Sequence, residues 1–179
     1  MKILFLTNKL PHAEVAGGHR LIYQRIRYLY ERGHQVGVLT FIQDESKEQI
    51  ESMRKVLNEL HTLPLPRRNI FVRAFHDYIS LSRPAVFWKL YSDEMIEQVG
   101  EVAEKGEYDL VISEFSEMGQ YLYKNPYLSA VHKVISCHRC VTDSYEKYMA
   151  LGEVRMKLHL KSIPQLRGCL LYTSPSPRD

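Results

Sequence analysis

Cysteine is scarce in this sequence, and long apolar runs are missing from it. The three cysteines are Cys137, Cys140 and Cys169, which give no disulfide framework. The amino terminus offers only the four apolar residues 3–6 before polar residues return, too few for the core of a signal peptide or for a membrane span. We therefore expect a cytoplasmic protein whose cysteines remain thiols.

A concentrated charge of one sign is also missing. Lysine and arginine together number 24, against 21 aspartates and glutamates, and the net charge is +3. This mild excess is not gathered into the basic stripe that a nucleic-acid footprint needs, so we expect no nucleic-acid partner. An anionic substrate or a membrane surface remains open. With 45% hydrophobic residues, the chain has enough apolar side chains for a domain with a real core.

The spacing of a metal site is missing as well. Cys137 and Cys140 form a C-x-x-C pair, which can be half of a zinc site, but a closed site needs four ligands and no second pair follows. The histidines His12, His19 and His34 show no ligand spacing. We expect no metal and no bound cofactor.

What the sequence does contain is an alternation of short apolar runs with segments of helical periodicity. Strands are predicted at 2–7, 34–41, 63–66, 108–114 and 131–137, and helices at 20–32, 44–60, 93–105 and 118–124, with two more short helices between 67 and 92 that break before Pro84. Gly33 is expected to close the first helix in the left-handed conformation. This order predicts an α/β fold, a Rossmann-like open parallel sheet with helices on both faces.

The segment 168–179 differs from the rest of the chain. It shows no periodicity, carries two prolines two positions apart, and resembles a translated sequencing adapter. A natural disordered terminus is the alternative. We expect one domain over 1–167 and a non-native or disordered tail over 168–179.

A glycine pair follows the first predicted strand. Gly17 and Gly18 stand just before a helix, where backbone N–H groups and the helix amino terminus can approach phosphate oxygens. Arg20, in the first turn, could add a charge-assisted contact to phosphate. The alternatives are that the glycines only make the turn, because a full G-x-G-x-x-G is absent, and that Arg20 is solvated.

A histidine ends the last predicted strand. His138 stands at the carboxyl end of what reads as a core strand, where open α/β sheets place their ligands. Its imidazole could accept a hydrogen bond from a substrate hydroxyl or assist deprotonation of that hydroxyl. The alternative is a single structural hydrogen bond. Glu114 and Asp143 are further candidates for binding substrate hydroxyls, with helix capping or solvation as their alternatives.

Several segments together resemble the start of family 4 glycosyltransferases, and in particular transferases of exopolysaccharide assembly. They are residues 1–11, 17–20, 32–40, 82–94, 108–115, 116–122 and 134–148. The resemblance covers nearly all of 1–167 and implies the GT-B fold, in which two Rossmann-like domains face a cleft. It implies that the acceptor binds mainly to the first domain and the nucleotide sugar mainly to the second, with no required metal.

The resemblance further implies that this chain is only the first, acceptor-side domain. The expected partners of the intact enzyme are a nucleotide-sugar donor and a glycan or lipid-linked acceptor, with transfer of a hexose and retention of configuration. His138 matches a histidine that the family uses near the transferred sugar. The second domain, with its two glutamates eight apart, is missing, so we expect this chain to be inactive alone.

Cations and aromatic residues alternate in the middle of the chain. We expect a possible peripheral contact with the inner face of a membrane through Arg67, Arg68, Arg73, Phe87 and Trp88. The alternative is that the aromatic rings pack in the core and the arginines are exposed.

Two other functions fit parts of the sequence. A free-standing Rossmann-like nucleotide-binding or interaction module would use the same glycine turn without catalysis. A nicotinamide-dependent oxidoreductase fits less well, because the third glycine is missing and Phe41 and Ile42 stand where an acidic residue should end the second strand.

Overall fold

The computed structural model describes residues 1–67, 69, 71–72, 85–128 and 131–138. The contacts divide the chain into two compact units. The first consists of Met1–Leu65 and Ser92–His138, and the second of Pro66–Tyr91 and Arg139–Asp179. The candidate site lies in the first unit.

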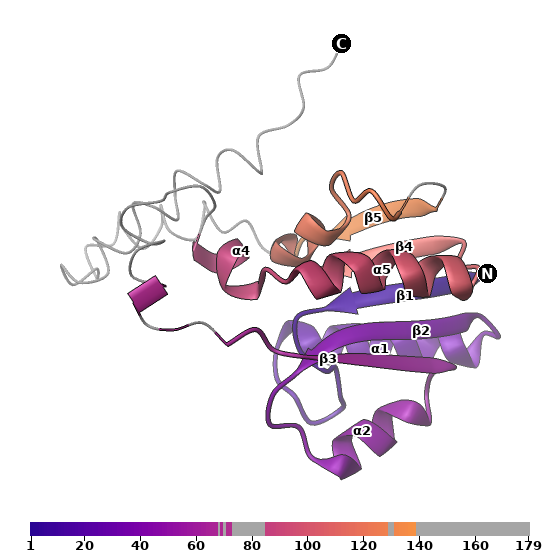
Figure 1. Ribbon diagram of the computed structural model, residues 1–179. Helices are drawn as coiled ribbons and strands as arrows, with labels where there is room; N and C mark the ends of the chain where they lie inside the picture. Colours follow the sequence, from indigo (N-terminus) through magenta and orange to yellow (C-terminus); the bar gives the residue numbers. More distant parts are fainter. Residues whose placement is uncertain (68, 70, 73–84, 129–130, 139–179) are drawn as a thin grey trace, which may run out of the picture. The chain divides into compact units, whose positions relative to one another are not determined.

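The first unit is built on a five-stranded sheet in which every neighbouring pair is parallel (Figure 1). The strand order is β3-β2-β1-β4-β5. The strands are β1 Lys2–Thr7, β2 Gln35–Ile42, β3 Glu59–Pro64, β4 Leu110–Glu114 and β5 His132–Ser136. The predicted α/β Rossmann-like class is confirmed.

Helices cover both faces of this sheet. The helices of the first unit are α1 Gly18–Glu31, α2 Lys47–Arg54, α5 Asp93–Lys105 and the 3₁₀ helix η2 Ser116–Tyr121. In Figure 1, α1 runs behind the sheet and α5 runs in front of it. Because all neighbouring strands are parallel, the carboxyl ends of the five strands lie along one side of the sheet.

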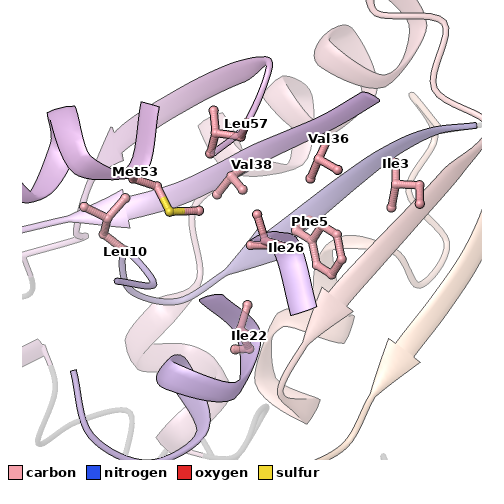
Figure 2. Packing of buried hydrophobic residues seen from close by; sticks show 9 residues of the cluster. All are labelled: Ile3, Phe5, Leu10, Ile22, Ile26, Val36, Val38, Met53 and Leu57. Carbon is pink, nitrogen blue, oxygen red and sulfur yellow. The ribbon is translucent and has the colours of Figure 1, made fainter. Parts of the chain in front are cut away.

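The core on the α1 face is formed by alternate residues of β1 and β2. Figure 2 shows this cluster, in which the strand side chains meet apolar residues of α1 and α2. Its buried members are Ile3, Phe5, Leu10, Ile22, Ile26, Val36, Val38, Met53 and Leu57. The alternation arises because successive side chains of a strand point to opposite faces.

The other face has a core of its own. The intervening residues Leu4, Leu6 and Leu39 are fully buried, and the ring of Phe41 lies 6.2 Å from that of Tyr121 in η2. Both faces of the central strands are thus covered, which explains why these strands read as continuous apolar runs.

The helix ends follow local signals in the sequence. Gly33 has a φ of 81° just after α1, as predicted for a residue that closes a helix in the left-handed region. Helix α2 begins with a capping box of Ser46 and Gln49. Helix α5 begins after Ser92, whose hydroxyl accepts a hydrogen bond from the Met95 amide, and spans the residues predicted for it.

Two predicted helices differ from the observed ones. The helix predicted at 44–60 ends at Arg54, and Leu60 belongs to β3. Asn58 explains the change, because its amide nitrogen and its side-chain oxygen both bond to the backbone of Val36 at 2.8 Å and draw the chain into the sheet. The helix predicted at 118–124 is the 3₁₀ helix Ser116–Tyr121.

The strand before His138 was predicted to be a core strand, and this is wrong. Strand β5 is the edge strand of the sheet, and Val134 and Ile135 are 47% and 49% exposed. A short apolar run cannot distinguish a central strand from an edge strand, because both contain β-branched residues.

In the second unit, the structure describes the short helix α4, Ala85–Leu90, directly after Pro84. Phe87 is 3% exposed and Trp88 is partly buried, whereas Arg67 is exposed. Arg68 and Arg73 lie outside the described residues. The Phe87 ring is therefore buried, in line with the alternative that the aromatic rings pack in the core. The membrane contact remains a prediction. Across the described ranges, no helix has the length and apolarity needed to cross a membrane.

Candidate functional site

The structure brings the glycine pair and His138 together at the carboxyl edge of the sheet. A Cβ built on Gly18 would lie 3.5 Å from Nδ1 of His138 and 3.0 Å from the ring of Phe115. Gly18 opens α1 after β1, whereas His138 lies two residues beyond the end of β5. The absence of a side chain at Gly18 leaves room for the Phe115 ring, because a Cβ at 3.0 Å would force that ring to move, whereas 3.5 Å to the imidazole is an ordinary contact.

The imidazole is held by a buried carboxylate. Glu114, the last residue of β4, is 0% exposed. Its Oε2 lies 2.7 Å from Nε2 of His138, and its Oε1 accepts a hydrogen bond of 2.6 Å from Nη1 of Arg25 in α1. Both carboxylate oxygens are therefore occupied by protein groups.

This pairing explains how a carboxylate can be buried at the end of a strand. An isolated buried charge is costly, and a cation together with hydrogen bonds offsets the loss of water. Arg25 supplies the cation from a helix that faces the same side of β4, and its Nη1 also lies 3.3 Å from Oγ of Ser136 in β5. Glu114 is neither solvated nor a helix cap, and it is better placed to hold His138 than to bind a sugar directly.

Three rings are in contact at the site. The centroid of the Phe115 ring lies 4.8 Å from that of His19 and 4.5 Å from that of His138, and both pairs are tilted. The backbone of Phe115 has φ 71° and ψ 145°, a conformation in which residues with a side chain are strained. Such strain persists only where surrounding contacts enforce it, and one of them is the 2.9 Å hydrogen bond that the Phe115 amide donates to Ser136 O.

His19 is fixed by a second polar chain. Its Nε2 lies 2.7 Å from Oδ1 of Asn8, and Nδ2 of Asn8 donates to Oε1 of Glu117 at 2.9 Å. Because the Asn8 amide nitrogen faces Glu117, its oxygen faces His19, and Nε2 of His19 carries the hydrogen. Burial, followed by the charges of Lys9, His138 and His12, holds the pKa of His19 below its usual value, which favours a neutral ring.

The other predicted site residues lie as follows. Gly17 has φ 74° and ψ −144°, precedes α1, and provides no side-chain cap for it. Arg20 is exposed in the first turn, and its amide donates to Gly17 O at 3.1 Å. Asp143 lies outside the described residues.

A polar hollow of about 260 Å³ adjoins the site. Its lining includes Lys9 and Asn8 after β1, Asp44 and Glu45 after β2, and Gln49 of α2. Asn8 is shared with the His19 chain, so the hollow and the imidazoles belong to one edge of the sheet. Amide, ammonium and carboxylate groups in one hollow suit a ligand with several hydroxyls, each of which can donate and accept.

Metal ligands do not gather in the part of the chain that is described. Among those residues, no group of three or more histidine, cysteine, aspartate or glutamate side chains could hold a metal ion. Cys137 is an exposed free thiol. Cys140 and Cys169 lie outside the described residues, so the expected absence of a metal remains a prediction.

Several residues of this network were not predicted. They are Arg25, Phe115, Asn8, Ser136 and Glu117, and none of them was singled out as a site residue. Arg25 and Glu114 are 89 positions apart, so only the fold brings them together. The one signal available was positional, because Glu114 and Phe115 end a predicted parallel strand, where open sheets hold their ligands.

No protein-family model matches the sequence, and the comparison with curated proteins finds no match. Among solved structures, a sucrose-phosphate synthase from Thermosynechococcus elongatus superposes with a TM-score of 0.52 and 12% identity, over 92% of this chain and 40% of the synthase. The carboxyl-terminal domain of a hydrogenase from Pyrococcus furiosus gives a TM-score of 0.49 and 20% identity, over 75% of this chain and 89% of that domain. The chain thus spans less than half of the synthase, and what it shares with that enzyme is the α/β fold.

Proposed function

We propose that this chain is the acceptor-side part of a GT-B glycosyltransferase of the family 4 type. The intact enzyme would transfer a sugar from a nucleotide-sugar donor to a glycan or lipid-linked acceptor, with retention of configuration, in exopolysaccharide assembly. The observation that carries the proposal is the adjacency of Gly18 and the His138 imidazole at the carboxyl edge of a parallel sheet.

The two sides of this adjacency suit the two halves of the reaction. The amino terminus of α1, opened by Gly17 and Gly18, favours the negative charge that develops on a leaving diphosphate. Arg20 in the same turn adds a positive charge. The imidazole of His138 accepts a hydrogen bond from a sugar hydroxyl at the reacting end.

The polar hollow suits the acceptor. It adjoins the site through Asn8, and Lys9, Asp44 and Gln49 can bond to the hydroxyls of one sugar ring. The order is then diphosphate at the start of α1, reacting hydroxyl near His138, and acceptor ring over the ends of β1 and β2. Such an arrangement aligns two reactants without covalent catalysis.

No cofactor is needed for this chemistry in the proposed enzyme, because the nucleotide sugar is a co-substrate and basic groups stabilise its diphosphate. We also propose that the protein acts at the cytoplasmic face of a membrane when its acceptor is lipid-linked, with the cationic segment around Arg67 near anionic headgroups. The nearby Arg68 and Arg73 would add to that charge.

The test uses the protein encoded by the uninterrupted gene. We expect it to release nucleoside diphosphate from one member of a panel of UDP-, GDP- and ADP-sugars when acceptor lipid or glycan extracts are added. His138→Ala should lower this release by about 10² or more, the usual contribution of a positioned acid–base group. His132→Ala, on the exposed start of the same strand, is the matched control and should leave the rate unchanged.

Two results would contradict the proposal. One is the absence of release and of sugar incorporation with every donor. The other is an H138A variant that transfers sugar as fast as the wild type.

A nucleotide-binding module without catalysis is the second candidate, favoured by the glycine-opened start of α1, which has no side-chain cap. Calorimetry of this chain with UDP, GDP and ADP distinguishes the two. Saturable micromolar binding to the chain alone supports the module, because an acceptor-side part leaves most nucleotide contacts to a second domain.

A further inference from the structure

One carboxylate of the site binds two side chains of different chemistry, a guanidinium and an imidazole. Glu114 Oε1 faces Nη1 of Arg25 at 2.6 Å, and Oε2 faces Nε2 of His138 at 2.7 Å. The Glu114 side chain is 0% exposed and that of His138 is 15% exposed, whereas the Arg25 side chain is 43% exposed. Water therefore reaches the guanidinium but not the carboxylate.

The direction of each hydrogen bond follows from what the groups can donate. A guanidinium has donors only, and an ionised carboxylate has acceptors only. Nε2 of His138 must therefore carry the hydrogen in the bond to Glu114. In a neutral ring this leaves the lone pair on Nδ1, the nitrogen that lies 3.5 Å from the Cβ position of Gly18.

We infer that Glu114 and Arg25 are positioning residues that hold His138 in the Nε2–H tautomer, with Nδ1 presented as the hydrogen-bond acceptor of the site. Glu114 selects the tautomer by accepting from Nε2. Arg25 fixes which carboxylate oxygen faces the ring, because it occupies the other one. The consequence for catalysis rests on the proposed sugar transfer, but the tautomer itself is a property of this chain.

The contacts with Glu114 and Arg25 anchor a histidine that the edge strand alone would not hold in place. His138 follows an edge strand whose residues are largely exposed, so the strand alone offers it little support. Glu114 ends the neighbouring strand and Arg25 comes from α1, so the imidazole is tied to two better covered elements. The tie from Arg25 to Ser136 Oγ reaches β5 itself.

The test replaces the carboxylate with an amide of the same shape. In Glu114→Gln, Arg25 still demands the oxygen, so the amide NH₂ turns toward His138 and donates to it. Nε2 must then hold the lone pair, and the hydrogen moves to Nδ1. We expect ¹⁵N NMR of histidine-labelled protein, at a pH where the ring is neutral, to show Nε2 protonated in the wild type and Nδ1 protonated in E114Q.

A double variant separates positioning from packing. In Arg25→Ala combined with Glu114→Gln, no guanidinium holds the amide oxygen, so the amide can offer either its oxygen or its NH₂ to His138, and we expect part of the Nε2–H signal to return. Arg27→Ala on the same helix removes only the exposed ion pair with Glu31 and should leave the tautomer unchanged. A purely structural loss of the Arg25 contact would not restore a signal.

Each outcome decides the inference. An Nδ1–H ring in the wild type overturns it without any variant having to fold, and an unchanged Nε2–H ring in E114Q overturns the role of Glu114. Failure of the double variant to restore Nε2–H overturns the role of Arg25. None of these measurements depends on sugar transfer, so they stand if the proposed function fails. In an active intact enzyme, E114Q should lower kcat by about 10² or more with little change in KM, because a ring of the wrong tautomer cannot accept the proton.

Discussion

The hydroxyl of Tyr108 occupies the space where a side chain on Gly37 would stand. Tyr108 precedes β4 and Gly37 lies in β2, so the phenol crosses over the intervening strand β1 to donate a 3.0 Å hydrogen bond to Glu59 of β3. One aromatic side chain therefore links both halves of the sheet, at the edge opposite the candidate site. The glycine in the middle of a buried strand is explained by this close approach.

Replacing Gly37 with alanine should destabilise the first unit, because the new methyl group must displace the Tyr108 ring and break its bond to Glu59. We expect a loss of about 1–3 kcal/mol, the usual cost of overpacking a filled core, measured by urea unfolding. Gly33→Ala, whose Cβ meets nothing within 4 Å, should lose stability only through its φ of 81° and serves as the control that leaves the Tyr108 environment unchanged. An unchanged Tyr108 environment in G37A would contradict the close approach.

The stability of the first unit should fall as the pH drops below about 6.5, the ordinary pKa of histidine. Burial lowers the pKa of His19 in the folded state, so below that pH the unfolded chain binds the proton more readily than the native chain. By linkage, stability is full above the unfolded pKa and is lost as the pH falls from there through the lower pKa of the folded state. Urea unfolding between pH 5 and pH 8 should therefore show a smaller loss for His19→Gln than for the wild type; equal losses would argue against a depressed pKa.

At position 115, glycine should be more stable than alanine, the reverse of the order expected for ordinary backbone. Phe115 has φ 71° and ψ 145°, a region that only glycine adopts without strain, and such strain costs about 1–3 kcal/mol. Phe115→Gly and Phe115→Ala both lose the ring, so their difference isolates the backbone term. Their urea midpoints supply the measurement, and a more stable alanine variant would show that the backbone is relaxed.

The two glycines before α1 should respond differently to alanine. Gly17 has open space around its Cβ position but a φ of 74°, so Gly17→Ala should cost stability through the backbone. In Gly18→Ala the methyl group would meet the Phe115 ring at 3.0 Å, so it should displace that ring and with it the neighbouring imidazole of His138. We expect G18A to reduce nucleotide or sugar binding by about tenfold or more at small stability cost, as clashes in filled pockets do; the opposite ranking would place the ligand elsewhere.

Much of the sheet could be predicted from the sequence, because buried parallel strands are short apolar runs and a glycine closes the first helix between two of them. Helix α5 was predicted at its observed bounds because five apolar residues share one face, and the structure adds Ser92 as its cap. The boundary of α2 was missed for a physical reason. The apolar positions 57 and 60 fit helical spacing, and only the bonds from Asn58 to Val36 assign them to the approach to β3.

The site could be predicted only in part. His138 and the glycine pair were found because they follow strands, and all strands of a parallel sheet end at one edge. Arg25 could not be predicted, because the face of α1 that carries it meets Glu114 only after α1 has packed on the sheet. Glu114 was identified as a candidate, but its burial and its contacts with Arg25 and His138 were not, because they arise only when the chain folds.

Because β5 is an edge strand, the position of the His138 imidazole depends on how stably β5 pairs with β4. Hydrogen exchange in β5 should be the fastest of the five strands, since its side chains are the least covered and edge pairing frays first. A molecule that binds to Val134 and Ile135 would slow this fraying and reduce the motion of the His138 ring without contacting it. Binding at the exposed side chains of β5 would then change how His138 acts.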